Sequence, residues 1–522
     1  MDQHSTSSGP KVELVASTRN ITARDAASTA GSAVSVNRNN DGDDNNDDDG
    51  VQSYFESAQW TADGTTILTY SSSNLISGYI VPEDLLAPDK PAPLPLTPQA
   101  AIQLPEPSNA IAAAPYFSLA EPYTNQVLAS ARDHPIQLFY LSSTPSPSPS
   151  SSQPSSPPPA ASYPFTKTSR SETFLSATSL IWPTPGSHFI AGSRSLLAKF
   201  DVSRPGASSE PIIRVKTIPS ERHLLKGGGV GMRGTVSALG AQPPDSNYSG
   251  LVAAGTWTRW VGLYDFGAAG ECVAAWSVAS AATEFQYPSS PSSPGNQEGD
   301  KEQQHHQKQE GIGGSGITQT IWSPCGRYLL IAERKSRGML VYDVRVTGRL
   351  LGCLTGRDTA DSNQRVSCDV FPGSSSSPGG GGGDGEAGFE VWSGAATGSG
   401  GGGVVKVWEG VGAREGAHEP SWAWRAYDDA STTVGAACVH PSGSVVATCA
   451  GSWAFTDDDN DDDDDGSRSS SSSTEMAWMR RRNRESSLKI WSISANNQSD
   501  DHDGRGVSRE PVEGDGRNTN RL

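Results

Sequence analysis

One unit recurs along this 522-residue chain, and it restricts the possible folds more than any other feature. An apolar segment ends near a Trp or an aliphatic residue, and a turn of the type x-P-x-G or x-D-G follows, such as "SPCG", "TPG", "ADG" or "PSG". A second apolar segment ends in small residues, and a short polar loop leads into a third that closes on an aromatic residue. Val, Ile, Leu and aromatics dominate without a helical period, so each apolar segment is predicted to be a β-strand.

The unit occurs at residues 58–81, 123–141, 180–202, 251–266, 321–345, 389–410 and 438–455, the last resuming at 487–493. Its closing aromatics are Tyr79, Phe139, Phe200, Tyr264, Tyr342, Trp408 and Trp491. A fourth strand is visible in three copies, at 271–278, 348–356 and 420–429. Seven four-stranded units predict an all-β, seven-bladed β-propeller. A pair of β-sandwiches is the alternative, and the repeated turn pattern argues against it.

Low-complexity segments lengthen the repeat. The closing aromatics lie from 60 residues apart (Tyr79 to Phe139) to 83 apart (Trp408 to Trp491), beyond the ~40–45 of an ordinary blade. Pro-, Ser- and Gly-rich tracts account for the excess, because they cannot bury enough apolar surface to fold. We expect disordered tails at 1–50 and 495–522, and a propeller over 51–494. Its expected inserts are 87–109, 142–162, 279–315, 372–388 and 456–475.

The formal net charge of −18 comes mostly from two acidic runs. Residues 41–49 hold six Asp and 457–465 hold eight, so the rest has 58 − 14 = 44 acids against 40 bases. The runs are typical of solvated spacers, and the alternative is a role in repelling or mimicking nucleic acid. The segment "MRRRNRE" (479–485) is interpreted as a nuclear import signal, an RNA contact or compensation for the adjacent Asp run.

Several functional classes are disfavoured. No apolar run reaches the roughly 18–20 residues that cross a bilayer, and no apolar secretory region follows the N-terminus, so no membrane partner is expected. The six cysteines form no CxxC pair and most lie in strand-like segments, which favours buried free thiols over zinc ligands. P-loop, GxSxG, HExxH and dinucleotide motifs are missing, so we expect no enzyme and no cofactor, and a hydrolase is the weakest hypothesis.

The ordered stretches resemble WD-repeat proteins and, more closely, the telomerase Cajal-body WD-repeat family. The resembling stretches are "FESAQWTADGTTILTYSSSN" (55–74), "VLASARDHPIQLFYL" (127–141), "VAAGTWTRWVGLYDF" (252–266), "NQRVSCDVFP" (363–372) and a split last blade at 433–455 and 488–493. "SPCG" replaces the common P-D-G turn, and "YD" or "WE" replaces W-D. The resemblance implies a nuclear protein, with nuclear bodies as one site and the cytoplasm as the alternative. It also implies small H/ACA-type or telomerase RNA and ribonucleoprotein proteins as partners.

Cations recur in the loops between the second and third strands of consecutive units. Antiparallel connectivity places all of these loops on one face of the disc. They contribute Arg132, Arg194, Arg259, Arg334, Lys335 and Arg337. Trp257 offers a ring for base stacking, and Arg365 is added by the resemblance alone. The hypothesis is an RNA-binding face, since clustered cations attract phosphates even when net charge is negative. These residues could instead serve solubility or pair with acids of neighbouring blades. A scaffold for protein partners in signalling, similar to G-protein β subunits, is the alternative function.

Overall fold

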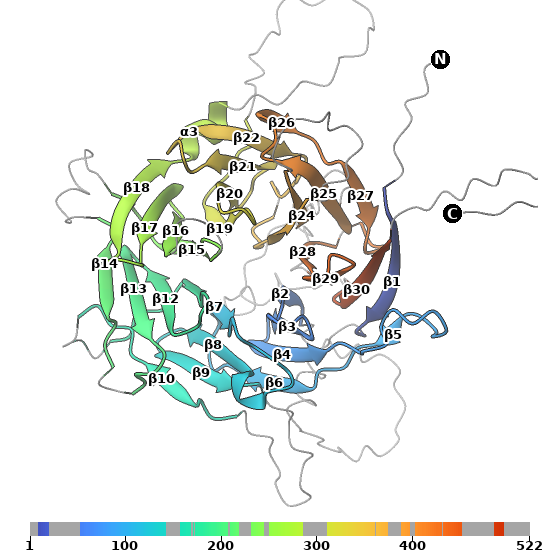
Figure 1. Ribbon diagram of the computed structural model, residues 1–522, viewed down its shortest axis with the longest axis horizontal. Coiled ribbons are helices and arrows are strands. Elements are labelled where there is room, and N and C mark those ends of the chain that lie inside the picture. The colour runs from blue at the N-terminus through green and yellow to red at the C-terminus, as the bar shows by residue number, and fades with distance from the viewer. Residues whose placement is uncertain are drawn as a thin grey trace, which may run out of the picture.

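Seven sheets, antiparallel apart from one added edge strand in each of two sheets, surround a central channel in the computed structural model of the chain (Figure 1). The structure describes residues 9–19, 53–141, 157–168, 171, 173–206, 209–218, 231–244, 250–284, 311–360, 362–373, 388–396, 402–430, 432–451 and 485–494. The predicted all-β, seven-bladed propeller is therefore confirmed. Each sheet is one blade, and the blades are numbered here in chain order.

In each blade, four strands a to d run from the channel outward. Blade 1 is formed by β2 (Phe55–Trp60), β3 (Thr66–Ser71), β4 (Leu75–Ile80) and β6 (Ala100–Gln103). Blade 2 is formed by β7 (Ser108–Ala113), β8 (Gln126–Ala131), β9 (Ile136–Tyr140) and β10 (Ala161–Tyr163). Blade 3 is formed by β11 (Ser179–Ile181), β12 (His188–Ser193), β13 (Leu196–Asp201) and β14 (Ile213–Lys216). Blade 4 is formed by β15 (Val236–Ala241), β16 (Leu251–Thr256), β17 (Trp260–Asp265) and β18 (Glu271–Ser277).

The remaining blades each use a strand from elsewhere in the chain or an interrupted segment. Blade 5 is formed by β19 (Ile317–Trp322), β20 (Tyr328–Glu333), β21 (Gly338–Asp343) and β22 (Leu350–Thr355), with β26 (Gly416–His418) added at its edge. Blade 6 is formed by β23 (Cys368–Pro372), β24 (Phe389–Gly394), β25 (Val404–Val411) and β27 (Trp422–Arg425). Blade 7 is formed by β28 (Val434–Val439), β29 (Val445–Ala450), β30 (Leu488–Ser494) and β1 (Lys11–Ser17), with β5 (Leu94–Pro95) at its edge. The fourth strands predicted at 271–278, 348–356 and 420–429 are β18, β22 and β27 and are confirmed.

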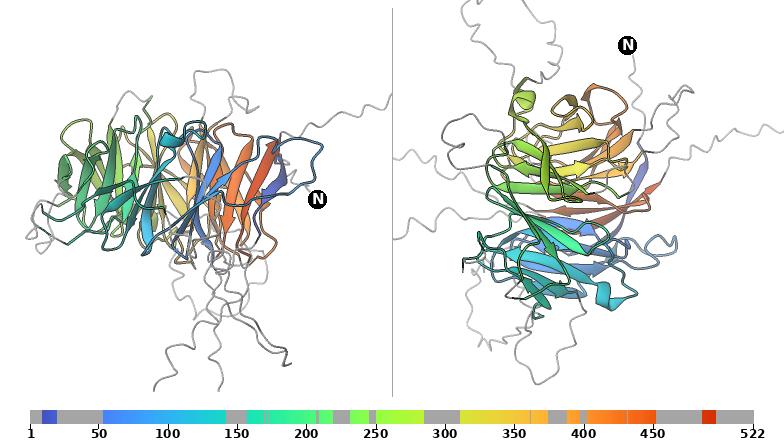
Figure 2. Two further views of the ribbon diagram at one scale, coloured as in Figure 1. Left: turned by 90° about the horizontal axis from the view of Figure 1, so that it is seen from below. Right: turned by 60° about the vertical axis from the view of Figure 1, so that its left-hand side comes forward.

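The order of the strands separates the two faces of the disc. Strands a and c run one way and strands b and d the other, so the b–c turns and the d–a connections lie together on one face, called here the b–c face. The a–b and c–d turns lie on the opposite face, called here the a–b face. Figure 2 shows the disc edge-on, with the strands crossing its thickness between the two faces.

All seven closing aromatics are strand-c residues in the core, where they are at most 8% exposed. Burying rings of this size supplies much of the stabilisation of the fold. In blade 7 the Trp491 indole Nε1–H donates to Thr448 Oγ1 at 2.9 Å, and in blade 6 the Trp408 Nε1–H donates to the Thr355 carbonyl at 3.2 Å. The rings therefore fill the space between blades while their N–H groups stay satisfied.

A ring of hydrogen bonds joins each blade to the next near the channel. The links in blade order are Ser108 N–H to Tyr70, Ala177 N–H to Ser130, Ser179 to Val236, Ser237 to Ile317, Gln319 to Cys368, Val439 N–H to Asp369, and Trp60 to Cys438. Gln319 makes two of the bonds at its interface: its amide donates to the Cys368 carbonyl at 2.9 Å and its oxygen accepts the Cys368 N–H at 2.9 Å. Hydrogen bonds of side chains thus replace the backbone ladder that adjacent blades lack.

The N-terminal strand completes blade 7, which corrects the expectation of a disordered tail over 1–50. Strand β1 pairs antiparallel with β30, from Lys11 opposite Ser494 to Ser17 opposite Lys489, and runs parallel to β5 of the blade 1 c–d connection. Ala16 is fully buried between them. Alternation in "KVELVAS" is the signal that the sequence analysis passed over, because it is surrounded by polar chain.

Three of the expected inserts also need correction. Residues 87–109 contain β5, β6 and the start of β7, and β5 tolerates Pro95 because it is an edge strand. Strand β10 begins inside 142–162, and residues Ala279–Glu284 form the helix α3. The other calls on inserts fall mostly outside the described residues, as do the acidic runs, segment 479–485 up to residue 484, and the tail 495–522.

Candidate nucleic-acid interface

The b–c turns of blades 2 to 5 have a common geometry. Each contains one non-glycine residue with a positive φ: Asp133 at 58°, Ser195 at 55°, Arg259 at 64° and Lys335 at 54°. A left-handed residue is what reverses the chain within so few residues, and the same feature recurs at Asn74 in blade 1. The turns therefore present their side chains at equivalent places around the b–c face, which confirms the loops assigned from the sequence.

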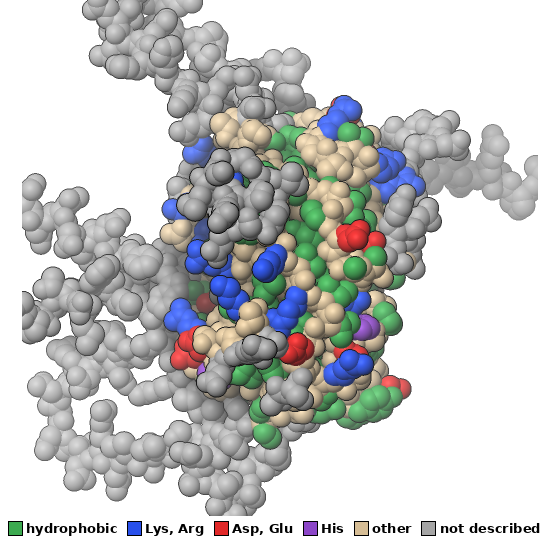
Figure 3. Space-filling model, turned by 90° about the vertical axis from the view of Figure 1, so that its left-hand side faces the viewer, with side chains coloured by type: hydrophobic (Ala, Val, Ile, Leu, Met, Phe, Trp, Pro, Cys, Tyr) green, Lys and Arg blue, Asp and Glu red, His purple; other side chains and the backbone are tan. Residues whose placement is uncertain are grey.

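Four of the eight predicted site residues are exposed cations on this face. They are Arg132 in blade 2, Arg194 in blade 3, and Lys335 and Arg337 in blade 5. Trp257, in the blade 4 turn between them, is 46% exposed. These five residues are called here the basic rim. Figure 3, which looks at the outer edge of blades 3 and 4, shows Lys and Arg side chains gathered over this part of the disc.

The arginines of the two faces differ in their partners. On the a–b face, Arg204 pairs with Asp201, Arg345 with Asp343, and Arg349 with Glu415. Among the described residues, Arg132, Arg194 and Lys335 of the basic rim have no carboxylate within ion-pair distance. Exposed cations that form no ion pair remain available to an external anion.

Arg259 lies in the same row of turns but is already engaged. Its Nε–H donates to Glu333 Oε1 at 2.7 Å and its Nη2 donates to Oε2 at 2.8 Å, and Nη2 also reaches the Gly313 carbonyl at 3.1 Å. The guanidinium is 19% exposed and the carboxylate 2%. Burial raises the pKa of Glu333, and the arginine opposes that rise. Arg259 is thus placed in a link between blades 4 and 5, the pairing that the sequence analysis held as an alternative to RNA contact.

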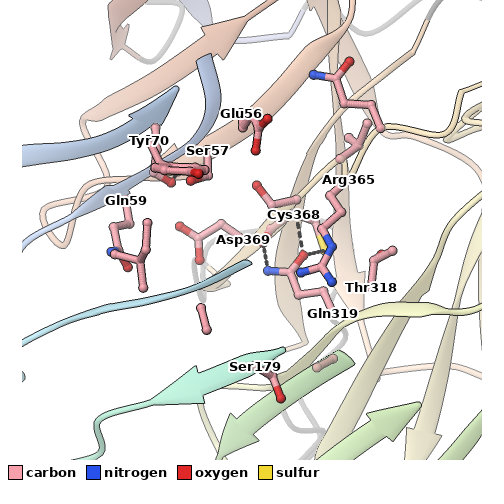
Figure 4. Close-up of a pocket in the computed structure, with 18 of the residues that line it drawn as sticks. Glu56, Ser57, Gln59, Tyr70, Ser179, Thr318, Gln319, Arg365, Cys368 and Asp369 are labelled. Carbon is pink, nitrogen blue, oxygen red and sulfur yellow. Dashed lines mark hydrogen bonds between the residues drawn. The ribbon is translucent and has the colours of Figure 1, made fainter. Parts of the chain in front are cut away.

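Arg334 and Arg365 face the central channel instead of the outer rim. Both line a cavity of about 1010 Å³ that contacts the innermost strands of all seven blades. Figure 4 shows Arg365 near Gln319 and Cys368, with Glu56 across the channel mouth. Burial and, to a smaller extent, the charge of Arg334 lower the pKa of Arg365 to about 10, and Glu56 opposes the shift. Arg334, Arg365 and Glu56 are called here the channel mouth.

Two basic residues on this side of the disc were missed by sequence reasoning. Lys216 ends β14 opposite Leu196, so it lies beside the turn that carries Arg194, and it is exposed. Its strand was not recognised, although "IIRVK" alternates. Arg357 is 1% exposed and donates to the carbonyls of Glu333 and Val366 and to Ser393 Oγ. Its structural role has no sequence signal, because its partners are mostly backbone groups from two blades.

Trp260, His134 and the cysteines belong to neither the basic rim nor the channel mouth. Trp260 is half-buried against the blade 3–4 core. His134 Nδ1 lies 2.6 Å from the Arg132 carbonyl, which fits a turn-stabilising role. Cys353, Cys368, Cys438 and Cys449 are buried free thiols as predicted, whereas Cys272 and Cys325 are exposed, contrary to the prediction for the set. Within the described ranges, no cluster of potential metal ligands and no helix long and apolar enough to cross a membrane is found.

Comparison with known proteins identifies distant relatives. No protein-family model matches the chain. The Telomerase Cajal body protein 1 of Bos taurus is 24% identical over 410 residues, covering 78% of this chain and 59% of that protein. The same protein of Rattus norvegicus is 23% identical over 415 residues, covering 78% and 60%. The Guanine nucleotide-binding protein negative regulator 1 of Schizosaccharomyces pombe is 23% identical over 319 residues, covering 61% and 66%. The chain is therefore a distant homologue of WD-repeat proteins and spans about three fifths to two thirds of their length.

Proposed function

We propose that this protein is a nuclear WD-repeat scaffold whose b–c face binds an unpaired loop of a small H/ACA-type or telomerase RNA. It acts by binding, without turnover, and leaves other surfaces for ribonucleoprotein proteins. The observation that carries the proposal is the contrast between the faces: among the described residues, the exposed Arg132, Arg194 and Lys335 of the basic rim have no carboxylate within ion-pair distance, whereas Arg204, Arg345 and Arg349 on the a–b face do.

The physical chemistry of the basic rim fits such a ligand. Arg132, Arg194 and Lys335 come from three blades of one face, so they match a phosphate chain that curves around the disc. Trp257 supplies an exposed ring between them, and stacking of a splayed base on a ring contributes about 1–3 kcal/mol. The similarity to Telomerase Cajal body protein 1 supports telomerase RNA as a specific ligand.

The test reverses charge on one face at a time. We expect Arg132→Glu/Arg194→Glu/Lys335→Glu to lower the small RNA crosslinked to the full chain in cells at least tenfold. The matched control is Arg204→Glu/Arg345→Glu/Arg349→Glu, three exposed arginines of the a–b face, which should change the yield less than twofold. Binding of a single-stranded RNA in vitro should lose about 0.7 of its log–log salt slope for each phosphate contact removed. Full RNA retention by the rim variant would rule the proposal out.

The second candidate is a protein scaffold in G-protein signalling. The specific observation in its favour is the similarity to the Schizosaccharomyces pombe negative regulator. A scaffold held by apolar contacts responds weakly to salt and keeps its partners after RNase treatment. Recovery of the same protein partners from RNase-treated cells with the rim variant and with the wild type, together with absence of crosslinked RNA, would favour this function.

A further inference from the structure

The central channel holds two arginines, each with a buried side-chain nitrogen that the described residues leave without a hydrogen-bond partner. Arg334 follows β20 and Arg365 precedes β23, so both stand at the b–c end of the channel. Arg334 Nε and Arg365 Nη2 are buried and, among the described residues, have no hydrogen-bond acceptor. Neither residue forms an ion pair within the described part of the chain. Buried donors without partners are rare because each one is costly.

The same region shows that the fold can satisfy a buried arginine where its role is structural. Arg357 donates to two carbonyls and a hydroxyl, and Arg259 grips both oxygens of Glu333. Arg334 and Arg365 receive no such partners, although carbonyls and side-chain oxygens line the same cavity. Their unpaired groups therefore mark a place for an acceptor that the described residues do not supply.

The charges of the channel mouth indicate that the ligand is an anion. Two guanidinium groups lie close enough for Arg334 to lower the pKa of Arg365, so they repel one another. Glu56 is the carboxylate that interacts with Arg365 there, and burial raises the pKa of Glu56, which weakens it as a counter-ion. A dianion relieves the repulsion between both arginines, and guanidinium groups match the geometry of phosphate oxygens.

We propose that the channel mouth binds a phosphate monoester through Arg334 and Arg365, and that the ligand body extends into the channel. The cavity of about 1010 Å³ is at the upper end of ligand pockets and far exceeds a phosphate group. Its walls carry neutral hydroxyl groups such as those of Ser57, Ser179 and Thr318, which Figure 4 shows along the channel. The phosphate group arrives on a phosphorylated side chain or on a free metabolite, since both present the same oxyanion.

This site is independent of the RNA proposal. The basic rim lies on exposed turns, whereas Arg334 and Arg365 line the channel. The rim variants leave both channel arginines in place, and a phosphate monoester needs no RNA. Loss of RNA binding in the rim variant with phosphate binding retained would separate the two sites, and the reverse pattern would do the same.

The experiment is titration calorimetry on the purified full chain at constant ionic strength set with chloride. The probes are inorganic phosphate, ribose 5-phosphate, and a pentapeptide with a central phosphoserine beside its serine counterpart. We expect Arg334→Gln and Arg365→Gln each to weaken binding of the best probe at least tenfold. Glu56→Gln should tighten it about threefold or more, because the repelling carboxylate is gone. The variant Arg204→Gln, at an exposed arginine of the opposite a–b face, should stay within twofold of wild type.

Each outcome decides the proposal. Stronger binding of the phosphopeptide than of its serine counterpart and of ribose 5-phosphate assigns a phosphorylated side chain, and the opposite order assigns a metabolite. If Arg365→Gln fails to fold, Arg334→Gln and Glu56→Gln carry the test, since a folding defect does not tighten binding. No heat from any phosphate probe beyond that of chloride, or wild-type binding by both arginine variants, would overturn the proposal.

Discussion

Arg259 in the blade 4 b–c turn donates two hydrogen bonds, of 2.7 and 2.8 Å, to the buried carboxylate of Glu333. Glu333 is the last residue of strand β20 in blade 5. The Glu333 carbonyl in turn accepts a hydrogen bond from Arg357 at 3.2 Å. Blades 4, 5 and 6 are thus linked through one residue on the b–c face. Because burial still raises the pKa of Glu333, the desolvation of the pair offsets much of its Coulombic attraction.

This pair predicts a strongly non-additive mutant cycle. Arg259→Met leaves the Glu333 carboxylate buried without a cation and should lower the free energy of unfolding by about 3 kcal/mol. The double variant Arg259→Met/Glu333→Met removes both charges. Its free energy of unfolding should fall clearly less than that of Arg259→Met alone. Urea denaturation measures both, and Arg132→Met on the exposed rim should change stability by less than about 0.5 kcal/mol. Equal losses in the single and double variants would contradict the prediction.

Asp369 predicts a pH-dependent stability. Its carboxylate accepts the Val439 N–H at 2.8 Å across the blade 6–7 interface, and burial raises its pKa from 3.8 to about 6. The folded state therefore holds the proton more tightly than the unfolded state. Its contribution to stability is present below pH 4 and is lost as the pH rises through about 6, by at most about 3 kcal/mol.

Asp369→Asn should remove this part of the pH dependence. The pKa values of Glu56 and Glu333 are also raised, so both groups make the unfolding free energy fall as the pH rises. The informative quantity is therefore the difference in unfolding free energy between Asp369→Asn and wild type at each pH. Unfolding free energies measured between pH 4 and 7 should show a flatter curve for the variant. The exposed Asp133→Asn should follow the wild-type curve, and an Asp369→Asn curve parallel to wild type would show that Asp369 does not titrate in this range.

The N-terminal strand predicts a large effect of a short truncation. Removing residues 1–19 deletes β1, exposes the β30 edge and strips Val12, Leu14 and Ala16 from the blade 7 core. We expect the free energy of unfolding to fall by about 3 kcal/mol or more from lost apolar burial alone. Removing residues 1–8 keeps β1 and should leave denaturation unchanged. Indistinguishable denaturation midpoints for the two truncations would mean that the last blade closes without this strand.

The position of the acidic runs predicts their electrostatic effect. Residues 20–52 connect β1 to β2, and residues 452–484 connect β29 to β30, so both Asp-rich segments join the propeller on the b–c face. Within roughly a Debye length their charge reduces the attraction of the basic rim for a polyanion. Replacing the eight Asp of 457–465 by Asn should raise affinity for single-stranded RNA in 0.05 M salt.

The salt dependence of the RNA affinity is the internal control for the comparison between wild type and the Asp→Asn variant of 457–465. The gain should shrink in 0.5 M salt, because screening removes interactions between charges separated by solvent. Replacing eight neutral polar residues of the C-terminal segment 495–522 by other neutral residues controls for composition. Unchanged affinity at low salt would assign the run to a spacer role, the other interpretation of its sequence.

Structural features that have a local sequence pattern were predicted, and strands that depend on distant partners were missed. The seven closing aromatics, the PxG and DG turns and the b–c loops are local patterns, and the structure confirms each of them. Strand β1 was missed because its partner β30 lies over 470 residues later, so nothing near it in the sequence completes its sheet. The pairing strands at 94–95 and 161–163 were hidden for a related reason, since short edge strands leave little pattern.

For the candidate site, too, the sequence predicted some properties of the cations and not others. Sequence reasoning identified the cations and the face that they share, because strand order alone decides which turns lie together. It grouped Arg132, Arg259 and Arg334 together as loop cations, whereas the first is exposed, the second is paired and the third lines the channel.

The amino-acid sequence by itself determined that this chain forms repeated four-stranded units and that the polar turns of those units carry positive charge, since strand period and turn chemistry act between near neighbours. Only the tertiary structure decided which of these charges remain available to a ligand. That outcome depends on carboxylates and carbonyls brought in from other blades, and closing the disc is what places them within bonding distance.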